Sequence, residues 1–169
     1  IGYHAVSVIA DAHVKGIRGF DEKLALEAML AMANSDRFGL SAYRKYGYIP
    51  ADLESESVSK TLEYAYDDWC IGMFAHRNMC DMTDEFARES PRFYSRSRAW
   101  KYLVDPRCFL RARANGRFVE PFDPREVTFD YTEANAWQYR FFVPQDIGGL
   151  AGMLRFTEGR GDVHVPAEA

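Results

Sequence analysis

The stretch from Glu56 to Trp69, ESVSKTLEYAYDDW, predicts a long helix. Apolar residues recur in it every three or four positions, which is the spacing of one face of an α-helix. The same spacing continues on both sides, so we expect the helix to run from about Glu54 to Met79. A stripe of this kind packs against neighbouring helices. It is made of Val58, Leu62, Ala65, Trp69 and Met73.

The segments before this helix carry the same helical pattern. They predict one helix from Ala5 to about Lys15 and a second from Glu22 to about Asn34, with Asp21 as the N-cap of the second. The apolar face of the second helix is expected to consist of Leu24, Ala28 and Ala31. Residues 38–53 contain glycines and a proline, so they are predicted to form a loop.

The segments after the long helix are less uniform. A helix is expected from Asp81 or Thr83 towards Val104, with a bend at Pro91. The dipeptide Asn115-Gly116 is typical of a type I′ turn and predicts a small β-hairpin insertion near residues 109–120. Two more helices are expected, from about Asp130 to just before Pro144 and from Pro144 to about Phe156.

These elements together predict an all-α architecture of helical hairpins with one β-hairpin. We expect a single domain over residues 1–156. Residues 157–169 show no periodicity and are expected to be a disordered or non-matching tail.

The composition is that of an ordinary globular chain, with 169 residues, 47% of them apolar. The 21 basic and 25 acidic residues give a net charge of −4, which argues against nucleic acid as a partner. No run approaches the roughly 18 apolar residues of a membrane span. The aromatic content of 15% suits a carbohydrate or peptide contact surface, and it suits a packed core even better.

The first residue that could carry chemistry is Glu133, in the run Tyr131–Tyr139. On the predicted helix, Glu133 lies one turn before Trp137. A carboxyl beside an indole and an apolar wall has its pKa raised by desolvation and can act as a general acid. The alternative is structural, because Asp130 and Glu133 have the spacing of a helix capping box.

The second candidate is the charged face of the long helix, which carries Glu56, Lys60, Glu63 and Asp67. Glu63 and Asp67 place like charges one helical turn apart, which is unfavourable unless something compensates. Compensation could come from Lys60, from an arginine of another helix, or from a polar cavity that binds sugar hydroxyls. The alternative is a solvated charged face.

Nothing in the sequence predicts a metal site. The four histidines, His4, His13, His76 and His164, lack the HExxH spacing of zinc enzymes. The three cysteines, Cys70, Cys80 and Cys108, form no CxxC pair and are expected to be buried as small apolar residues.

Several runs resemble one enzyme family when they are taken in order. They are Gly2–Ala12 (GYHAVSVIADA), Gly47–Pro50 (GYIP), Glu56–Trp69, and Tyr131–Tyr139 (YTEANAWQY). They are similar to glycoside hydrolase family 92, the calcium-dependent, exo-acting α-mannosidases. The resemblance implies an (α/α)₆ toroid as catalytic domain, an inverting mechanism, and a general acid at Glu133.

The resemblance also implies other parts of the site. Trp137 and Gln138 would shape the pocket of the acid, and Glu63, Asp67 and Asp68 are candidates for its polar, substrate-binding lining. The partners would be α-mannoside glycans, and the intact enzyme would use Ca²⁺ held by ligands outside this chain. Family members are commonly exported, which implies a secreted or periplasmic protein. The oligomeric state stays open.

The sequence also departs from the family pattern. No segment matches the second carboxylate motif, which holds the general base, or the stretch that supplies calcium ligands. Gln145 stands where a histidine is expected, and the match is lost after Leu154. A toroid of twelve helices needs about 200 residues or more. The sequence therefore predicts a fragment of an α-mannosidase that carries the acid, lacks the base and is inactive alone.

Two alternatives remain for the function. One is another (α/α)₆ glycosidase, such as a glucosidase or a trehalase-like enzyme. The other is a non-catalytic helical module that binds sugar or serves a structural purpose.

Overall fold

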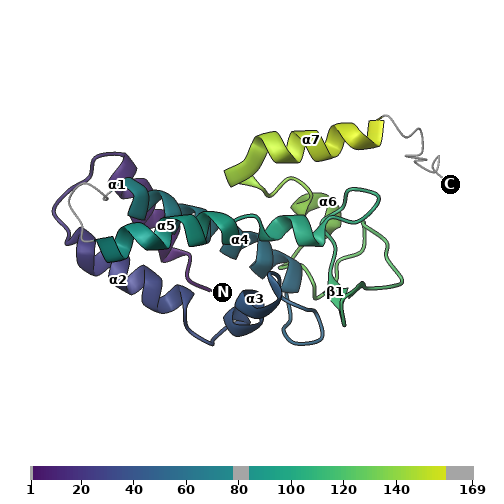
Figure 1. The fold of residues 1–169 in the computed structure, drawn as a ribbon. Helices are drawn as coiled ribbons and strands as arrows, with labels where there is room; N and C mark the ends of the chain where they lie inside the picture. Colours follow the sequence, from purple (N-terminus) through teal and green to yellow (C-terminus); the bar gives the residue numbers. More distant parts are fainter. Residues whose placement is uncertain (1, 78–83, 159–169) are drawn as a thin grey trace.

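The computed structural model describes residues 2–77 and 84–158. Figure 1 shows one long central helix, α4, with α1, α2 and α5 along one half of it and with α7, loops and shorter elements around the other half. The elements in chain order are α1 (Ala5–Val14), α2 (Glu22–Ala33), α3 (Leu40–Tyr46), α4 (Ser57–Arg77), α5 (Asp84–Arg96), the 3-10 helix η1 (Ala99–Leu103), β1 (Arg113–Ala114), β2 (Arg117–Phe118), α6 (Ala136–Tyr139), the 3-10 helix η2 (Pro144–Asp146) and α7 (Ile147–Glu158).

Helix α4 is buried on nearly all sides and packs most extensively against α5 and α1. Its two halves belong to two different clusters of apolar side chains. We call the first the helical core; its members include Val6, Leu26, Ile71, Phe74 and Phe93. We call the second the loop-side core; its members include Leu62, Trp100, Leu110, Tyr131 and Val143. The two clusters meet along α4.

Several sequence predictions are confirmed. The side chain of Asp21 caps α2 by accepting a hydrogen bond from the backbone N–H of Leu24 at 3.0 Å. Strands β1 and β2 pair antiparallel as a hairpin around Asn115 and Gly116. Both turn residues have positive φ, 50° and 77°, as a type I′ turn requires. The fold is helix-rich with one small hairpin, as expected.

The apolar face predicted for α2 is wrong. Leu24 is 61% exposed, and Ala28 and Ala31 are also exposed. The buried residues are Leu26, Met29 and Ala33. Apolar residues lie all around this helix, so two faces have the correct spacing, and packing against the rest of the protein selects between them.

Other boundaries also differ from the prediction. Residues 40–46 form α3, inside the segment predicted as a loop, and Gly39 and Gly47 flank it with φ of 77° and 78°. Helix α4 begins at Ser57 because Glu56, with φ of 56°, is left-handed and cannot belong to it. The helix expected to reach Val104 ends at Arg96, and η1 follows it.

The last parts of the prediction are only partly covered by the described residues. Helix α7 runs to Glu158, two residues beyond the expected end, and most of the expected tail lies outside the described residues. The same holds for Cys80 and for the predicted start at Asp81 or Thr83. Cys70 and Cys108 are buried thiols, as expected.

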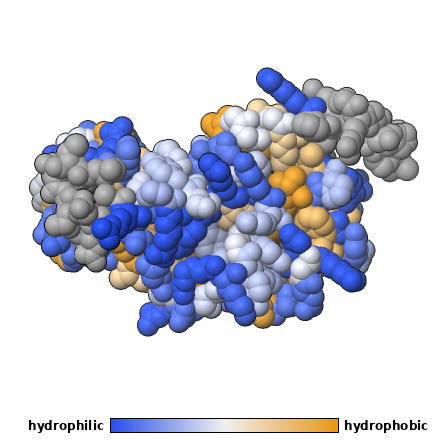
Figure 2. Space-filling model, viewed as in Figure 1, coloured by the Kyte–Doolittle hydropathy of each residue, from blue (hydrophilic) through white to orange (hydrophobic). Residues whose placement is uncertain are grey.

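The surface is mixed on the face shown in Figure 2. Apolar side chains gather over α7 and the segments next to it, whereas the part around α5 is mostly hydrophilic. Within the described ranges, no helix combines the length and apolar character needed to cross a lipid bilayer.

Candidate functional site

Glu133 lies in a turn that precedes α6, and not on a helix. Its φ is 50°, in the left-handed region that residues other than glycine seldom occupy, and its side chain is exposed. The helix predicted from Asp130 is therefore wrong in its first half, because α6 starts only at Ala136 and has four residues. A left-handed residue cannot belong to a right-handed helix.

The capping box predicted as an alternative exists, but other residues form it. Asn135 is the N-cap of α6, and its side chain accepts a hydrogen bond from the backbone N–H of Gln138 at 3.1 Å. The side-chain oxygen of Gln138 in turn accepts from the backbone N–H of Asn135 at 3.0 Å. Asp130 instead bonds to Thr128. Glu133 therefore does not cap α6, and its side chain is exposed.

Trp137 lies in α6, with its ring partly exposed. Its ring and that of Phe109 form a T-shaped pair with centroids 4.8 Å apart, and the guanidinium of Arg140 lies 5.0 Å from the ring centroid. The one-turn relation between Glu133 and Trp137 that the sequence suggested is absent, because only Trp137 is helical. Trp137 therefore lies at the edge of the loop-side core, with part of its ring on the surface near α6.

The segment before Glu133 is fixed along the first turn of α4. The backbone N–H of Glu56 donates to the carbonyl of Phe129 at 2.7 Å, and that of Val58 donates to the carbonyl of Asp130 at 3.0 Å. One residue before the glutamate, the backbone N–H of Thr132 donates to the buried Ser59 hydroxyl at 2.8 Å. The Glu133 turn therefore leaves directly from the start of the central helix.

Glu63 and Asp67 lie together on α4, and His4 bridges them. The His4 Nε2 lies 2.9 Å from Glu63, and its Nδ1 lies 2.9 Å from Asp67. Of the compensating groups considered from the sequence, Lys60 pairs instead with Glu54 at 2.5 Å and Glu56 at 3.7 Å. The compensating cation at Glu63 and Asp67 is thus a histidine of another segment.

The two carboxylates hold a proton on His4. Hydrogen bonds to Asp67 and then to Glu63 raise the pKa of His4 to about 10, against the lowering effect of burial. Burial raises the pKa of Asp67, and the nearby His4 opposes this rise. Because the pKa of His4 lies so far above its usual value, His4 is an imidazolium at neutral pH.

Sequence reasoning missed His4 as part of this cluster. One signal was available, since His4 belongs to the Gly2–Ala12 run that resembles the family. A second was the pair of like charges at Glu63 and Asp67, which required a cation. Nothing in the sequence shows that the N-terminal segment folds back onto α4.

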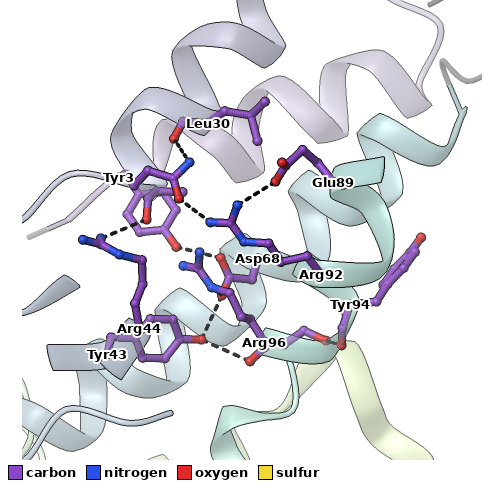
Figure 3. A network of polar contacts seen from close by, with 12 residues as sticks. Tyr3, Leu30, Tyr43, Arg44, Asp68, Glu89, Arg92, Tyr94 and Arg96 are labelled. Atoms are coloured by element: carbon purple, nitrogen blue, oxygen red, sulfur yellow. Dashed lines mark hydrogen bonds and ion pairs between the residues drawn. The ribbon is translucent and has the colours of Figure 1, made fainter. Parts of the chain in front are cut away.

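Asp68 belongs to a different network, and Figure 3 shows it between Tyr3, Tyr43 and Arg96. Its carboxylate accepts hydrogen bonds from the hydroxyls of Tyr3 at 3.1 Å and Tyr43 at 2.9 Å, and from Arg96 Nε at 3.0 Å. The side chain is wholly buried. Burial raises the pKa of Asp68 to about 7, although Arg96 and the tyrosines lower it. Asp68 therefore ties α3, α4, α5 and the N-terminal segment together.

The described residues show no cluster of acidic side chains of the kind that marks a calcium site. Calcium usually takes 6–8 oxygen ligands. In residues 2–77 and 84–158, no group of three or more histidine, cysteine or acidic side chains is arranged to hold a metal ion. Glu63 and Asp67 on α4 are already paired with His4, and Glu54 and Glu56, just before α4, are paired with Lys60.

Known proteins similar to this chain share this arrangement of helices. The sequence matches the glycosyl hydrolase family 92 catalytic domain over residues 1–159. The solved structure of the family GH92 α-mannosidase BT3965 from Bacteroides thetaiotaomicron is 41% identical, with a TM-score of 0.82, over 93% of this chain and 22% of that one. Another structure of BT3965, at 36% identity, a TM-score of 0.82 and coverage of 99% and 23%, is a complex with mannoimidazole.

Two more relatives agree with this assignment. The GH92 inverting mannosidase BT2199 from the same species is 32% identical, with a TM-score of 0.81, over 92% of this chain and 22% of that one. A protein described as an uncharacterized secreted glycosidase from Arthroderma benhamiae is 29% identical over 90% of this chain and 24% of its own length. This chain spans less than a quarter of the length of these relatives. It belongs to glycosyl hydrolase family 92, a family of glycoside hydrolases.

Proposed function

We propose that this chain is the acid-bearing part of an inverting, exo-acting α-mannosidase that hydrolyses terminal α-mannosides of glycans. The observation that carries the proposal is the geometry of Glu133. Its carboxyl is exposed, it has no capping function, and its left-handed turn is fastened to the first turn of α4. Left-handed residues other than glycine cost free energy and persist where the surrounding structure holds them, often at functional sites.

The proposed chemistry needs two carboxyl groups. Glu133 donates a proton to the leaving glycosidic oxygen, while a water molecule attacks the anomeric carbon from the opposite face of the sugar. A general base takes the proton of that water, and inverting enzymes place it roughly 6.5–9.5 Å from the acid. No residue of this chain is assigned as the base, so the chain alone is expected to be inactive.

The other site residues surround this acid in the proposal. Trp137 offers a partly exposed ring, and Gln138 fixes the start of α6. Glu63 and Asp67, with His4 between them, form a polar wall. Asp68 supports this wall from the core, because it holds Tyr3, the neighbour of His4. Calcium would be held by residues outside the described part of this chain.

Two features of the relatives inform the wider proposal. The complex of BT3965 with mannoimidazole supports a mannoside as the substrate. The description of the Arthroderma relative as secreted supports export of the protein that contains this chain.

Replacing Glu133 with glutamine tests the proposal in a polypeptide that contains this chain together with the further segments found in its relatives. Glutamine keeps the size of the side chain but cannot donate a proton as an acid. General acid catalysis contributes about 10²–10⁴-fold, so Glu133→Gln should lower kcat/KM by that factor on an alkyl α-mannoside. The loss should shrink on a 2,4-dinitrophenyl α-mannoside, whose leaving group needs little protonation.

A matched control is Glu126→Gln, which changes another exposed glutamate of the same segment. It should leave both rates unchanged. Near-normal turnover of the alkyl mannoside by Glu133→Gln would remove the catalytic role. Turnover of α-glucosides without turnover of α-mannosides would favour another glycosidase of the same architecture.

A further inference from the structure

The turn that carries Glu133 is held by groups that the chemistry itself does not use. The Ser59 hydroxyl lies in the first turn of α4, is buried, and accepts a hydrogen bond from the backbone N–H of Thr132 at 2.8 Å. Thr132 directly precedes the left-handed Glu133. The contact therefore fixes the backbone at the point where the turn departs from α4.

A second contact ties the far side of the turn back to α4. The hydroxyl of Tyr139, in α6, donates a hydrogen bond to Glu63 of α4 at 3.4 Å. Burial raises the pKa of this hydroxyl, so Tyr139 keeps its proton and remains a donor. Ser59, Thr132 and Tyr139 thus join α4 to both ends of the turn, and we call them the turn clamp.

The turn clamp is connected to the polar wall. Glu63 receives the Tyr139 hydroxyl on one carboxylate oxygen and His4 on the other. The charged groups that face Tyr139 and His4 are Glu63 and Asp67, both from α4. The protonated His4 holds Glu63 in place, and its positive charge offsets the repulsion between Glu63 and Asp67. The position of Tyr139 is therefore set from α4 and from the N-terminal segment.

We infer that Ser59 and Tyr139 are positioning residues that aim the carboxyl of Glu133 at the leaving oxygen of the substrate. This inference rests on the proposed function of Glu133. A general acid must lie within hydrogen-bonding reach of the oxygen it protonates. A misplacement of about 1 Å can cost about 10²-fold in rate, so a turn left free to move would weaken proton donation.

The test uses Tyr139→Phe and Ser59→Ala in the same longer polypeptide. Tyr139→Phe removes only the hydroxyl and keeps the ring contacts with Tyr131 and Phe142. Each variant should lower kcat on an alkyl α-mannoside by about 10–100-fold, with KM within about twofold. On a 2,4-dinitrophenyl α-mannoside the loss should be less than about threefold, because that leaving group needs little protonation. Tyr46→Phe and Ser41→Ala remove the same hydroxyls at exposed positions in α3 and should change neither rate.

Each outcome separates this inference from the proposed function. Equal losses on both substrates, with a lowered melting temperature, would mean that the two residues only stabilise the fold and would overturn the inference. Unchanged rates on both substrates would also overturn it. Glu133→Gln, assayed alongside, reports on the proposed function: a loss confined to the alkyl mannoside in Glu133→Gln alone would refute the clamp and keep the acid. If Ser59→Ala does not fold, Tyr139→Phe decides.

Discussion

The helical core and the loop-side core are built on the two halves of one helix, yet they are held together differently. The helical core joins α1, α2, α5 and the second half of α4 through apolar side chains, with one buried charged network around Asp68. The loop-side core surrounds the first half of α4 with α7, short elements and loops, fixed by hydrogen bonds between distant residues. The candidate site lies on the loop-side half, where the backbone can adopt the left-handed turn of Glu133.

The largest expected effect breaks the helical core at Asp68. Asp68→Leu would leave Arg96 buried without its carboxylate partner, and breaking a buried ion pair in this way costs about 3–5 kcal/mol. Urea unfolding should show this loss of stability. Asp68→Asn is the control, because it keeps the shape and can still accept a hydrogen bond, and it should lose less. Equal stability of Asp68→Leu and the unchanged chain would show that the network does not hold the helical core together.

A smaller effect is expected in the loop-side core at Tyr131. Its hydroxyl donates to the carbonyl of Leu110 at 2.8 Å, and both residues are buried. Tyr131→Phe leaves that carbonyl unsatisfied, which costs about 1–3 kcal/mol. Hydrogen exchange should speed up in residues 129–139 more than in α1 and α2. Uniform changes across both cores would mean that they unfold as one unit and do not differ in local stability.

The smallest effect concerns the link between the two regions at His4. Its pKa in the folded protein is about 10, against an ordinary value of 6.5, so the folded state binds this proton more tightly than the unfolded chain does. The stabilisation is therefore complete below about pH 6.5 and is lost as the pH rises towards 10. In His4→Gln, stability should fall less over this range than in the unchanged chain. Parallel pH curves for the two proteins would show that His4 carries no such proton.

Sequence patterns predicted the helical core better than the loop-side core, for a physical reason. The periodicity of α1, α2 and α4 and the Asn115-Gly116 turn are local signals, and the structure confirms these elements. The wrong face of α2 shows the limit of such signals, because packing against other elements chose between two apolar faces. The length of α6 was overestimated. No local sequence signal shows that Glu133 is left-handed and that Asn135 is the N-cap.

The candidate site was also predictable only in part. The one-turn spacing of Glu63 and Asp67 predicted that they share a face, and His4 bridges them. The spacing of these two residues could not identify His4 as their partner, because His4 lies far from them in the sequence, near the start of the chain. Asp68 is next to Asp67 in sequence but lies in the core, since neighbouring positions on a helix point about 100° apart.

The proposed role of Glu133 as the general acid of an α-mannosidase makes a specific prediction for the pH dependence of kcat/KM. A 4-nitrophenyl α-mannoside, whose leaving group is less activated than dinitrophenol and still gains from protonation, keeps the rate of Glu133→Gln measurable. In the unchanged protein, kcat/KM should fall at high pH as the acid loses its proton. Glu133→Gln should lose this high-pH decline and keep the decline at low pH, which belongs to the base. An identical high-pH decline in both proteins would mean that another residue is the acid and would refute the role of Glu133.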